Sequence, residues 1–153
     1  MAITIDNVRT LLQQMGAHIP ALDAIIEESP GSWQLLFDDA QLLNLHFLDD
    51  ESGLELVAVL GRPAADQELD VLRMLFCFQL IWRGGNQPRI ALDAPSGSLL
   101  CLCQISPSLI NTVKFEEAIL AFWIQAKTLT DMVSTGLPPP MPAATPDSLH
   151  LHA

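Results

Sequence analysis

The segment from Leu69 to Trp82, LDVLRMLFCFQLIW, is apolar around almost its whole circumference, although the chain carries a formal net charge of −11. At helical spacing it contains two apolar stripes on roughly opposite sides. The first stripe is Leu69, Leu72, Phe76 and Leu80, and the second is Val71, Met74, Phe78 and Trp82. A helix that is apolar all round is normally covered all round, and a chain of this length has one core to offer. The sequence therefore predicts that the second stripe packs against another subunit.

The composition indicates one acidic domain that stays in the cytoplasm. Half of the 153 residues are hydrophobic, which is enough for a single domain with its own core. The 18 acidic and 7 basic side chains disfavour binding to nucleic acid or to an anionic membrane surface. The longest strongly apolar run, Met74 to Trp82, is far shorter than the roughly 20 residues that cross a bilayer. The start, MAITIDNVRT, does not have the pattern of a secretory signal.

The first half of the chain predicts a helix followed by three strands. An amphipathic helix runs from Ile5 to Met15, with Gly16 as its stop. The apolar segment from Ile19 to Ile26 contains Pro20 and leads into two acidic residues, so we expect a loop with a short helical turn there. Three strand-like runs follow, separated by turns that contain Asp and Gly, which predicts an antiparallel meander. These runs are Trp33–Phe37, Leu42–Leu48 and Leu54–Leu60.

The second half predicts a helix, a hairpin and a last helix. The central helix begins near Ala65 and stops at Gly84, and the hairpin pairs Arg89–Asp93 with Leu99–Ile105. The last helix covers about Thr112 to Ser134 and packs an apolar stripe on the sheet. That stripe is Phe115, Ile119, Phe122, Ala126, Leu129 and Val133. The fold class is therefore α+β, in the order α-β-β-β-α-β-β-α, with a twisted antiparallel sheet packed by helices.

A proline-rich tail follows the predicted domain. Five prolines between Leu137 and the end of the chain occur without periodicity, which prevents regular structure. We therefore expect one domain over residues 1–136 and a disordered tail over residues 137–153.

No arrangement of residues predicts a cofactor or metal site. Cys101 and Cys103 lie on the same face of a strand, but His18 and His46 do not complete a ligand set, and the expected role of the two thiols is in the core. His150 and His152 belong to the tail, which has no scaffold to fix them. The glycine-containing turns lack the spacing of nucleotide-binding loops.

Several segments together resemble the class I chaperones of bacterial type III secretion, the Tir chaperone-like effector chaperones. They are Leu36-Phe37-Asp38-Asp39 at the end of the first strand, Leu60-Gly61 at the end of the third, the central helix with Gly84-Gly85, the strand Ile90-Ala91-Leu92-Asp93, and Phe115 to Phe122 in the last helix. The resemblance covers roughly residues 3 to 134. Cys77 and Phe78 depart from it, because the family often has small residues and Asn late in the central helix.

The resemblance implies a homodimeric chaperone of the bacterial cytoplasm that is not an enzyme and uses no cofactor. Such a chaperone binds the N-terminal segment of a secreted effector in extended, non-globular form and keeps it soluble and competent for export. A further partner implied by the resemblance is the ATPase of the secretion apparatus. Surplus apolar sheet surface offers a place for an added strand or an amphipathic segment of the client.

Two sets of residues are the predicted contacts. For the dimer interface these are Val71, Met74, Phe78 and Trp82, with Leu100 and Leu102 of the strand Leu99–Ile105. For effector binding they are Leu11 and Leu12 of the first helix, with Leu35, Phe37, Leu43, Leu45 and Phe47 of the meander. Some of the second set must be core, because apolar core and apolar binding residues share one pattern.

Two alternative functions remain open from the sequence. One is a small thiol-dependent α+β enzyme that uses Cys101 or Cys103, which would require a thiol that reacts rapidly in the native state. The other is a regulatory scaffold that binds another protein without a role in export.

Overall fold

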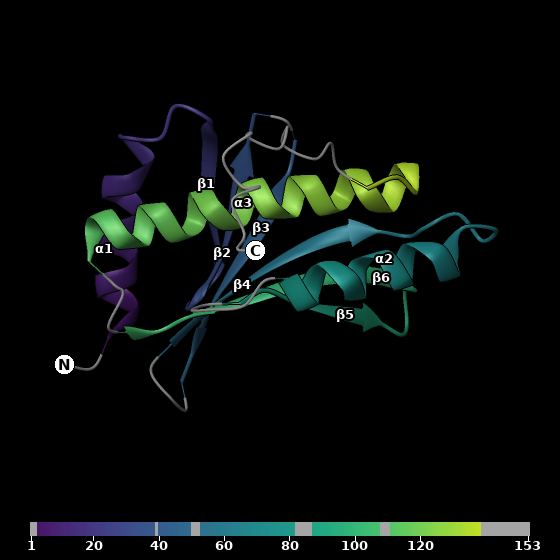
Figure 1. Ribbon diagram of the computed structural model, residues 1–153. Helices are drawn as coiled ribbons and strands as arrows, with labels where there is room; N and C mark the ends of the chain where they lie inside the picture. Colours follow the sequence, from purple (N-terminus) through teal and green to yellow (C-terminus); the bar gives the residue numbers. More distant parts are fainter. Residues whose placement is uncertain (1–2, 39, 50–52, 82–86, 108–110, 139–153) are drawn as a thin grey trace, which may run out of the picture.

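In the residues that the structure describes, three helices cover one face of a six-stranded antiparallel sheet (Figure 1). The structure is a computed structural model and describes residues 3–38, 40–49, 53–81, 87–107 and 111–138. The helices are α1 (Ile5–Gly16), α2 (Glu68–Ile81) and α3 (Thr112–Thr135). The strands are β1 (Leu22–Ser29), β2 (Ser32–Phe37), β3 (Leu42–Leu48), β4 (Gly53–Gly61), β5 (Arg89–Asp93) and β6 (Ser98–Ile105). Their order in the sheet is β1-β2-β3-β4-β6-β5.

Local sequence signals fix the helix ends. Thr4 caps α1 by accepting a hydrogen bond from the backbone N–H of Asn7, whose side chain accepts one in return from the backbone of Thr4. Asn111 caps α3 by accepting from the backbone N–H of Lys114. The central helix begins at Glu68 and not near Ala65, because the three residues before Glu68 form a turn.

Buried and more exposed residues alternate along the central strands. In β4, Leu54, Leu56, Ala58 and Leu60 are buried, while Val57 and Val59 on the other face keep exposed surface. The predicted stripe of α3 is buried along its full length, and α3 lies across β4 (Figure 1). The α+β fold class is therefore confirmed, and the core lies between the sheet and the helices.

One strand was not predicted. The segment expected to be a loop with a helical turn contains most of β1, which pairs antiparallel with β2 from Leu22 to Ser29. Pro20 lies before the first residue of the strand, where it removes no ladder hydrogen bond. Glu27 and Glu28 are tolerated because β1 is an edge strand, and charged residues are common on such edges.

The sequence also predicts a disordered tail and no membrane-spanning helix. Residues 139–153 lie outside the described residues, so the disordered tail and the domain boundary at residue 136 stay predictions. Within the described ranges, no helix is long and apolar enough to cross a membrane.

Candidate functional site

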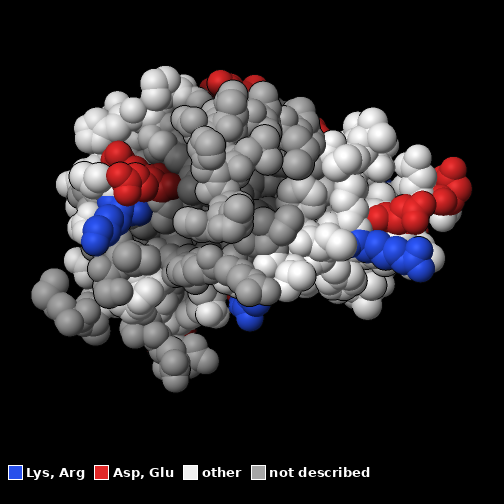
Figure 2. All heavy atoms as spheres, in the orientation of Figure 1, with Lys and Arg blue, Asp and Glu red and all other residues white. Residues whose placement is uncertain are grey.

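An exposed apolar stripe runs along the outer side of α2. Leu69, Phe76 and Leu80 keep 60%, 62% and 64% of their surface exposed. We call these three residues the α2 stripe. Figure 2 shows acidic and basic side chains grouped at the end of the molecule where α2 begins. Burial of large apolar side chains such as those of the α2 stripe normally contributes about 1.5–3 kcal/mol each. Their exposure therefore marks a surface that is suited to a partner.

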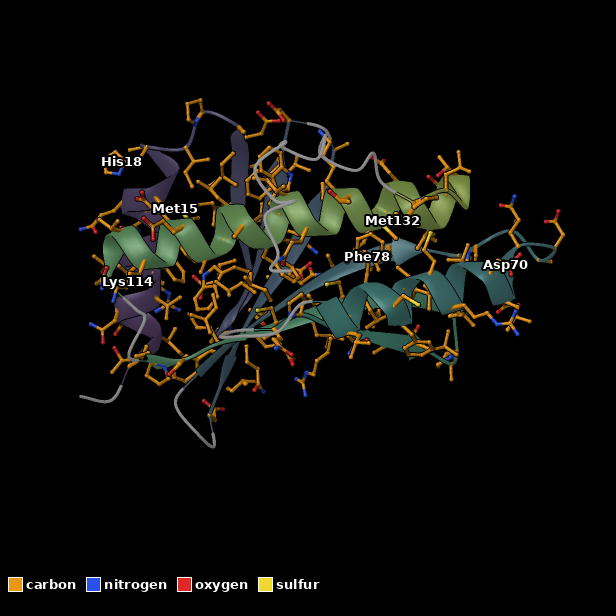
Figure 3. The ribbon with its side chains drawn as sticks, viewed as in Figure 1. Met15, His18, Asp70, Phe78, Lys114 and Met132 are labelled. Atoms are coloured by element: carbon orange, nitrogen blue, oxygen red, sulfur yellow. The ribbon has the colours of Figure 1, made fainter. Side chains whose placement is uncertain are left out.

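The described residues of the second predicted stripe turn toward the core of their own chain. Val71 is 1% exposed and belongs to the core of its own chain, so it has no surface left for a dimer contact. Met74 and Phe78 are half-buried against the same core, and Figure 3 shows Phe78 on the side of α2 that faces α3. Trp82 lies outside the described residues. Helical spacing separates two apolar faces but does not say which of them turns inward.

The predicted strand contacts lie on a different surface from the α2 stripe. Leu100 and Leu102 are half-buried on the sheet face that the helices do not cover, since the buried Cys101 and Cys103 point toward the helices. Leu92 of β5, by contrast, lies on the helix-covered face beside α2 and is 62% exposed. Sequence reasoning did not single out Leu92 as an exposed apolar residue, because only the fold shows that α2 lies beside β5.

The uncovered face of the sheet carries an apolar row. On this face, cross-strand pairs connect Ala24 to Leu36 and Leu36 to Leu42 in strands β1 to β3. On the same face, they connect Val59 to Leu100 and Leu100 to Ala91 in strands β4, β6 and β5. The surplus apolar sheet surface expected from the sequence is therefore present on this face.

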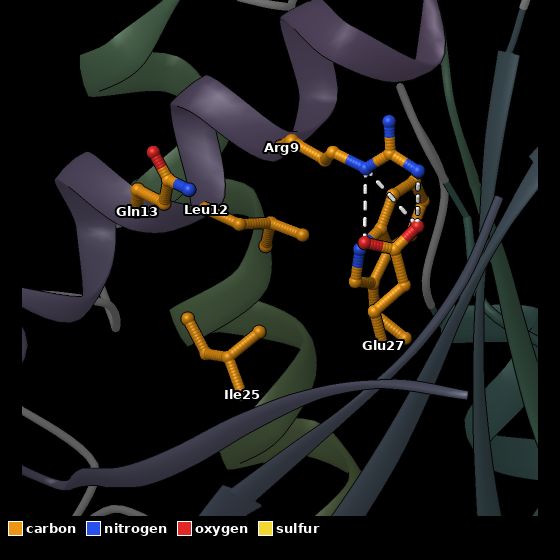
Figure 4. A pocket seen from close by; sticks show the side chains of 6 residues that line it. Arg9, Leu12, Gln13, Ile25 and Glu27 are labelled. Atoms are coloured by element: carbon orange, nitrogen blue, oxygen red, sulfur yellow. Dashed lines mark hydrogen bonds and ion pairs between the residues drawn. The ribbon is translucent and has the colours of Figure 1, made fainter. Parts of the chain in front are cut away.

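An open hollow of about 190 Å³ lies between α1 and the edge strand β1 (Figure 4). Leu12, Ile25 and Trp33 supply its apolar wall. Arg9, Gln13 and Glu27 supply its polar wall. We call this site the edge hollow. Of its six residues only Leu12 was predicted, because no pattern in the sequence indicates that Ile25 and Glu27 belong to a strand.

Arg9 joins α1 to β1 beside the edge hollow. Its Nη2 and Nε donate to the carboxylate of Glu27 at 2.6 and 2.9 Å, and its Nη1 donates to Asp6 at 2.7 Å. Hydrogen bonds from Arg9 hold the pKa of Glu27 below its ordinary value, with a smaller contribution from the Trp33 indole. The hydrogen bonds to Glu27 and Asp6 in turn raise the pKa of Arg9 above its ordinary value. The polar wall of the hollow is thus an internally neutralised cluster.

Most of the predicted effector contacts are core residues. The buried ones are Leu12, Leu35, Phe37, Leu43 and Leu45, none more than 2% exposed. Leu12 among them lines the edge hollow. Leu11 and Phe47 are half-buried and keep surface that a client could reach. The buried strand residues lie on the sheet face that α1 and α3 cover, so a client cannot reach them.

Comparison with known proteins decides the family. The chain matches the Tir chaperone protein (CesT) family over residues 10–130. It belongs to that family. The resemblance seen in the sequence is confirmed, and the chain is thereby a chaperone of type III secretion effectors.

Two solved structures share the fold of this CesT-family chaperone. A chain of the ExsC-ExsE complex superposes with a TM-score of 0.66 at 21% identity, covering 90% of this chain and 100% of that one. A chain of the HopA1-SchA chaperone–effector complex superposes with a TM-score of 0.61 at 16% identity, covering 84% and 98%. No curated protein matches the chain.

The two core thiols of the chaperone are poorly suited to catalysis. Burial raises the pKa of Cys101 to about 12, and it also raises the pKa of Cys103 above its ordinary value. A nucleophilic cysteine needs the opposite shift, because the thiolate is the reactive form. Among the described residues, no group of three or more His, Cys, Asp or Glu side chains could hold a metal ion.

Proposed function

We propose that this CesT-family chaperone holds the N-terminal segment of a secreted effector along the free edge of β1, in extended form. The observation that carries the proposal is the position of the edge hollow directly beside an edge strand. An extended peptide can add to a sheet edge through its backbone, while alternate side chains enter pockets that give specificity. Ile25 lies on the helix-covered face of β1 and forms part of the hollow, so a side chain from an added strand would meet it there.

The proposed chaperone is a homodimer whose two copies meet through the α2 stripe, with Leu92 beside it. Three aliphatic or aromatic side chains at 60% exposure or more are unusual for a surface helix. A two-fold interface is self-complementary, so one apolar stripe on a helix can pack against its own copy. A second copy is the partner always present at the same concentration. This assignment replaces the predicted contacts of Val71, Met74 and Phe78.

The β1 edge and the α2 stripe serve one task in the bacterial cytoplasm. Together they hold the effector segment before it is transferred to the secretion-apparatus ATPase. The client loses conformational entropy when it is ordered on the chaperone, and a long wrapped contact is needed to offset that cost. The net charge of −11 keeps a dimer with such apolar surfaces dispersed.

The test is co-expression with secreted proteins encoded next to this chaperone, followed by affinity capture. Wild-type chaperone should retain the N-terminal part of one secreted protein. The variant Ile25→Glu, which places a charge in the edge hollow, should lose that client. Ile124→Glu is the matched control, because Ile124 is an exposed isoleucine of α3 away from the hollow.

Circular dichroism of each variant shows whether it is folded. Retention of no secreted protein by the wild type would contradict the proposed function. Equal retention by the wild type and a folded Ile25→Glu variant would contradict the placement of the client at the edge hollow.

A further inference from the structure

We propose that the client segment at the β1 edge is cationic, with one basic side chain facing Asp23, another facing Glu28, and an apolar side chain between them in the edge hollow. This inference rests on the proposed function and specifies the chemistry of its client.

Two acidic side chains near the ends of β1 are exposed. Asp23 is exposed beside the irregularity between Leu22 and Ala24. Glu28 is exposed near the other end and accepts a hydrogen bond from the neutral side-chain amide of Gln34 at 2.7 Å. Within the described part of the chain, neither carboxylate forms an ion pair. Each therefore presents an uncompensated negative charge to anything that approaches the strand edge.

The basic side chain that lines the edge hollow is already engaged. Arg9 is the only Lys or Arg in residues 3–38, a part of the chain with five acidic residues. Its guanidinium binds Asp6 and Glu27, so it cannot neutralise Asp23 or Glu28 at the same time. An anionic client would meet repulsion at this edge, whereas a cationic client would be steered toward it.

The spacing along β1 sets the pattern of the client. Asp23 and Glu28 are five residues apart, which corresponds to about 16 Å in a strand. Ile25, which lines the hollow, lies between them. Residues directly opposite each other on paired strands have Cβ atoms about 5 Å apart, within reach of a lysine or arginine side chain. The client segment should therefore carry two basic residues about five positions apart with an aliphatic residue between them.

Two fluorescein-labelled synthetic peptides test this chemistry. Both have the same Thr- and Ser-based sequence, with leucines at the central positions. A leucine can then face Ile25 whether the peptide pairs with β1 in the parallel or the antiparallel direction. One carries lysines about five positions apart on the two sides of the leucines. The other has glutamates in their place. Fluorescence anisotropy measures the binding of each peptide to the intact chaperone at low and high salt.

The lysine peptide should bind roughly three- to tenfold more tightly than the glutamate peptide at low salt, the range expected for two exposed ion pairs. High salt should shrink that ratio, because it screens exposed charges. The double variant Asp23→Asn, Glu28→Gln should remove the preference. The matched double variant Asp66→Asn, Asp131→Asn, which changes two exposed acids away from β1, should keep it.

Three outcomes would overturn the inference: binding of neither peptide, equal binding of both, or a preference that survives in the double variant Asp23→Asn, Glu28→Gln. Failure of the proposed function is seen separately, in the capture experiment. A secreted protein that the wild type captures through an acidic segment would contradict the cationic client and leave the chaperone function intact.

Discussion

The rings of Phe37 and Trp123 are stacked, with centroids 4.6 Å apart and planes 12° apart. Phe37 is the last residue of β2, and Trp123 lies in the middle of α3. The ammonium group of Lys127, one turn further along α3, lies 5.8 Å from the centroid of the Trp123 ring. Aromatic pairs in this arrangement contribute beyond the area they bury. The pair therefore ties α3 to the sheet at a fixed position.

Replacing Phe37 by alanine should destabilise the chain by about 3–5 kcal/mol, because Phe37 is fully buried and its loss leaves a cavity under α3. The exposed Ile124 on the same helix is the control, and Ile124→Ala should cost less than about 0.5 kcal/mol. Urea unfolding at one fixed protein concentration measures both, since association shifts apparent stability. An unchanged midpoint for Phe37→Ala would show that the stack does not hold α3.

Cys101 and Cys103 should be alkylated by iodoacetamide at least about a hundredfold more slowly in the native protein than in urea, because burial raises both pKa values and blocks access. Mass spectrometry of peptides after timed quenching measures each rate. Rapid modification of either thiol in the native state would instead favour the thiol-dependent enzyme.

The contact between Arg9 and Glu27 should contribute to stability at neutral pH and lose that contribution in acid. The folded protein holds the pKa of Glu27 below its ordinary value of 4.5. The stabilisation is therefore fully present above the pKa of the unfolded chain and is lost as the pH falls through the lower pKa of the folded chain. Comparing unfolding midpoints of the wild type and Glu27→Gln over this range checks the sign. The account requires a difference that shrinks toward acid, and a difference that grows would contradict it.

Gly136→Ala and Gly61→Ala should each destabilise the chain by roughly 1–2 kcal/mol. Both glycines have positive φ, +66° at Gly136 and +92° at Gly61, a backbone conformation that is costly for an L-residue. A Cβ at Gly61 would meet nothing within 4 Å, and a Cβ at Gly136 would meet the end of the flexible Gln67 side chain, which can move aside.

The same unfolding measurement in a Gln67→Ala background tests whether the cost comes from the backbone. Removing the Gln67 amide should leave the cost of Gly136→Ala unchanged, because the Gln67 side chain can move aside in the wild type. A Gly136→Ala variant as stable as the wild type would contradict the left-handed backbone at the end of α3.

Much of the fold could be predicted from periodicity. The buried stripe of α3 and the alternation in β3 and β4 follow directly from the positions of apolar residues, because each element has one clearly apolar side. The strand β1 could not be found in the same way. Its two residues before Ser29 are acidic, and they are compatible with a strand because β1 lies at the edge of the sheet, a position that depends on the whole topology.

The candidate surfaces were harder to predict than the fold. Both faces of α2 are apolar, so the sequence could not tell that Val71 turns into the core and Phe76 turns outward. Leu35 and Leu43 look like binding residues in the sequence, yet both lie on the sheet face that the helices cover. The edge hollow combines residues of α1, β1 and β2, and it forms only when these elements meet.

The most direct test of the account is the molar mass of the purified chain by size-exclusion chromatography with light scattering. The account predicts a particle of two 16.7 kDa chains at micromolar concentration, and a single chain for the variant Phe76→Glu, which places a charge in the α2 stripe. A wild-type chain that is monomeric under these conditions would contradict the claim that its exposed apolar surface is shared with a second copy.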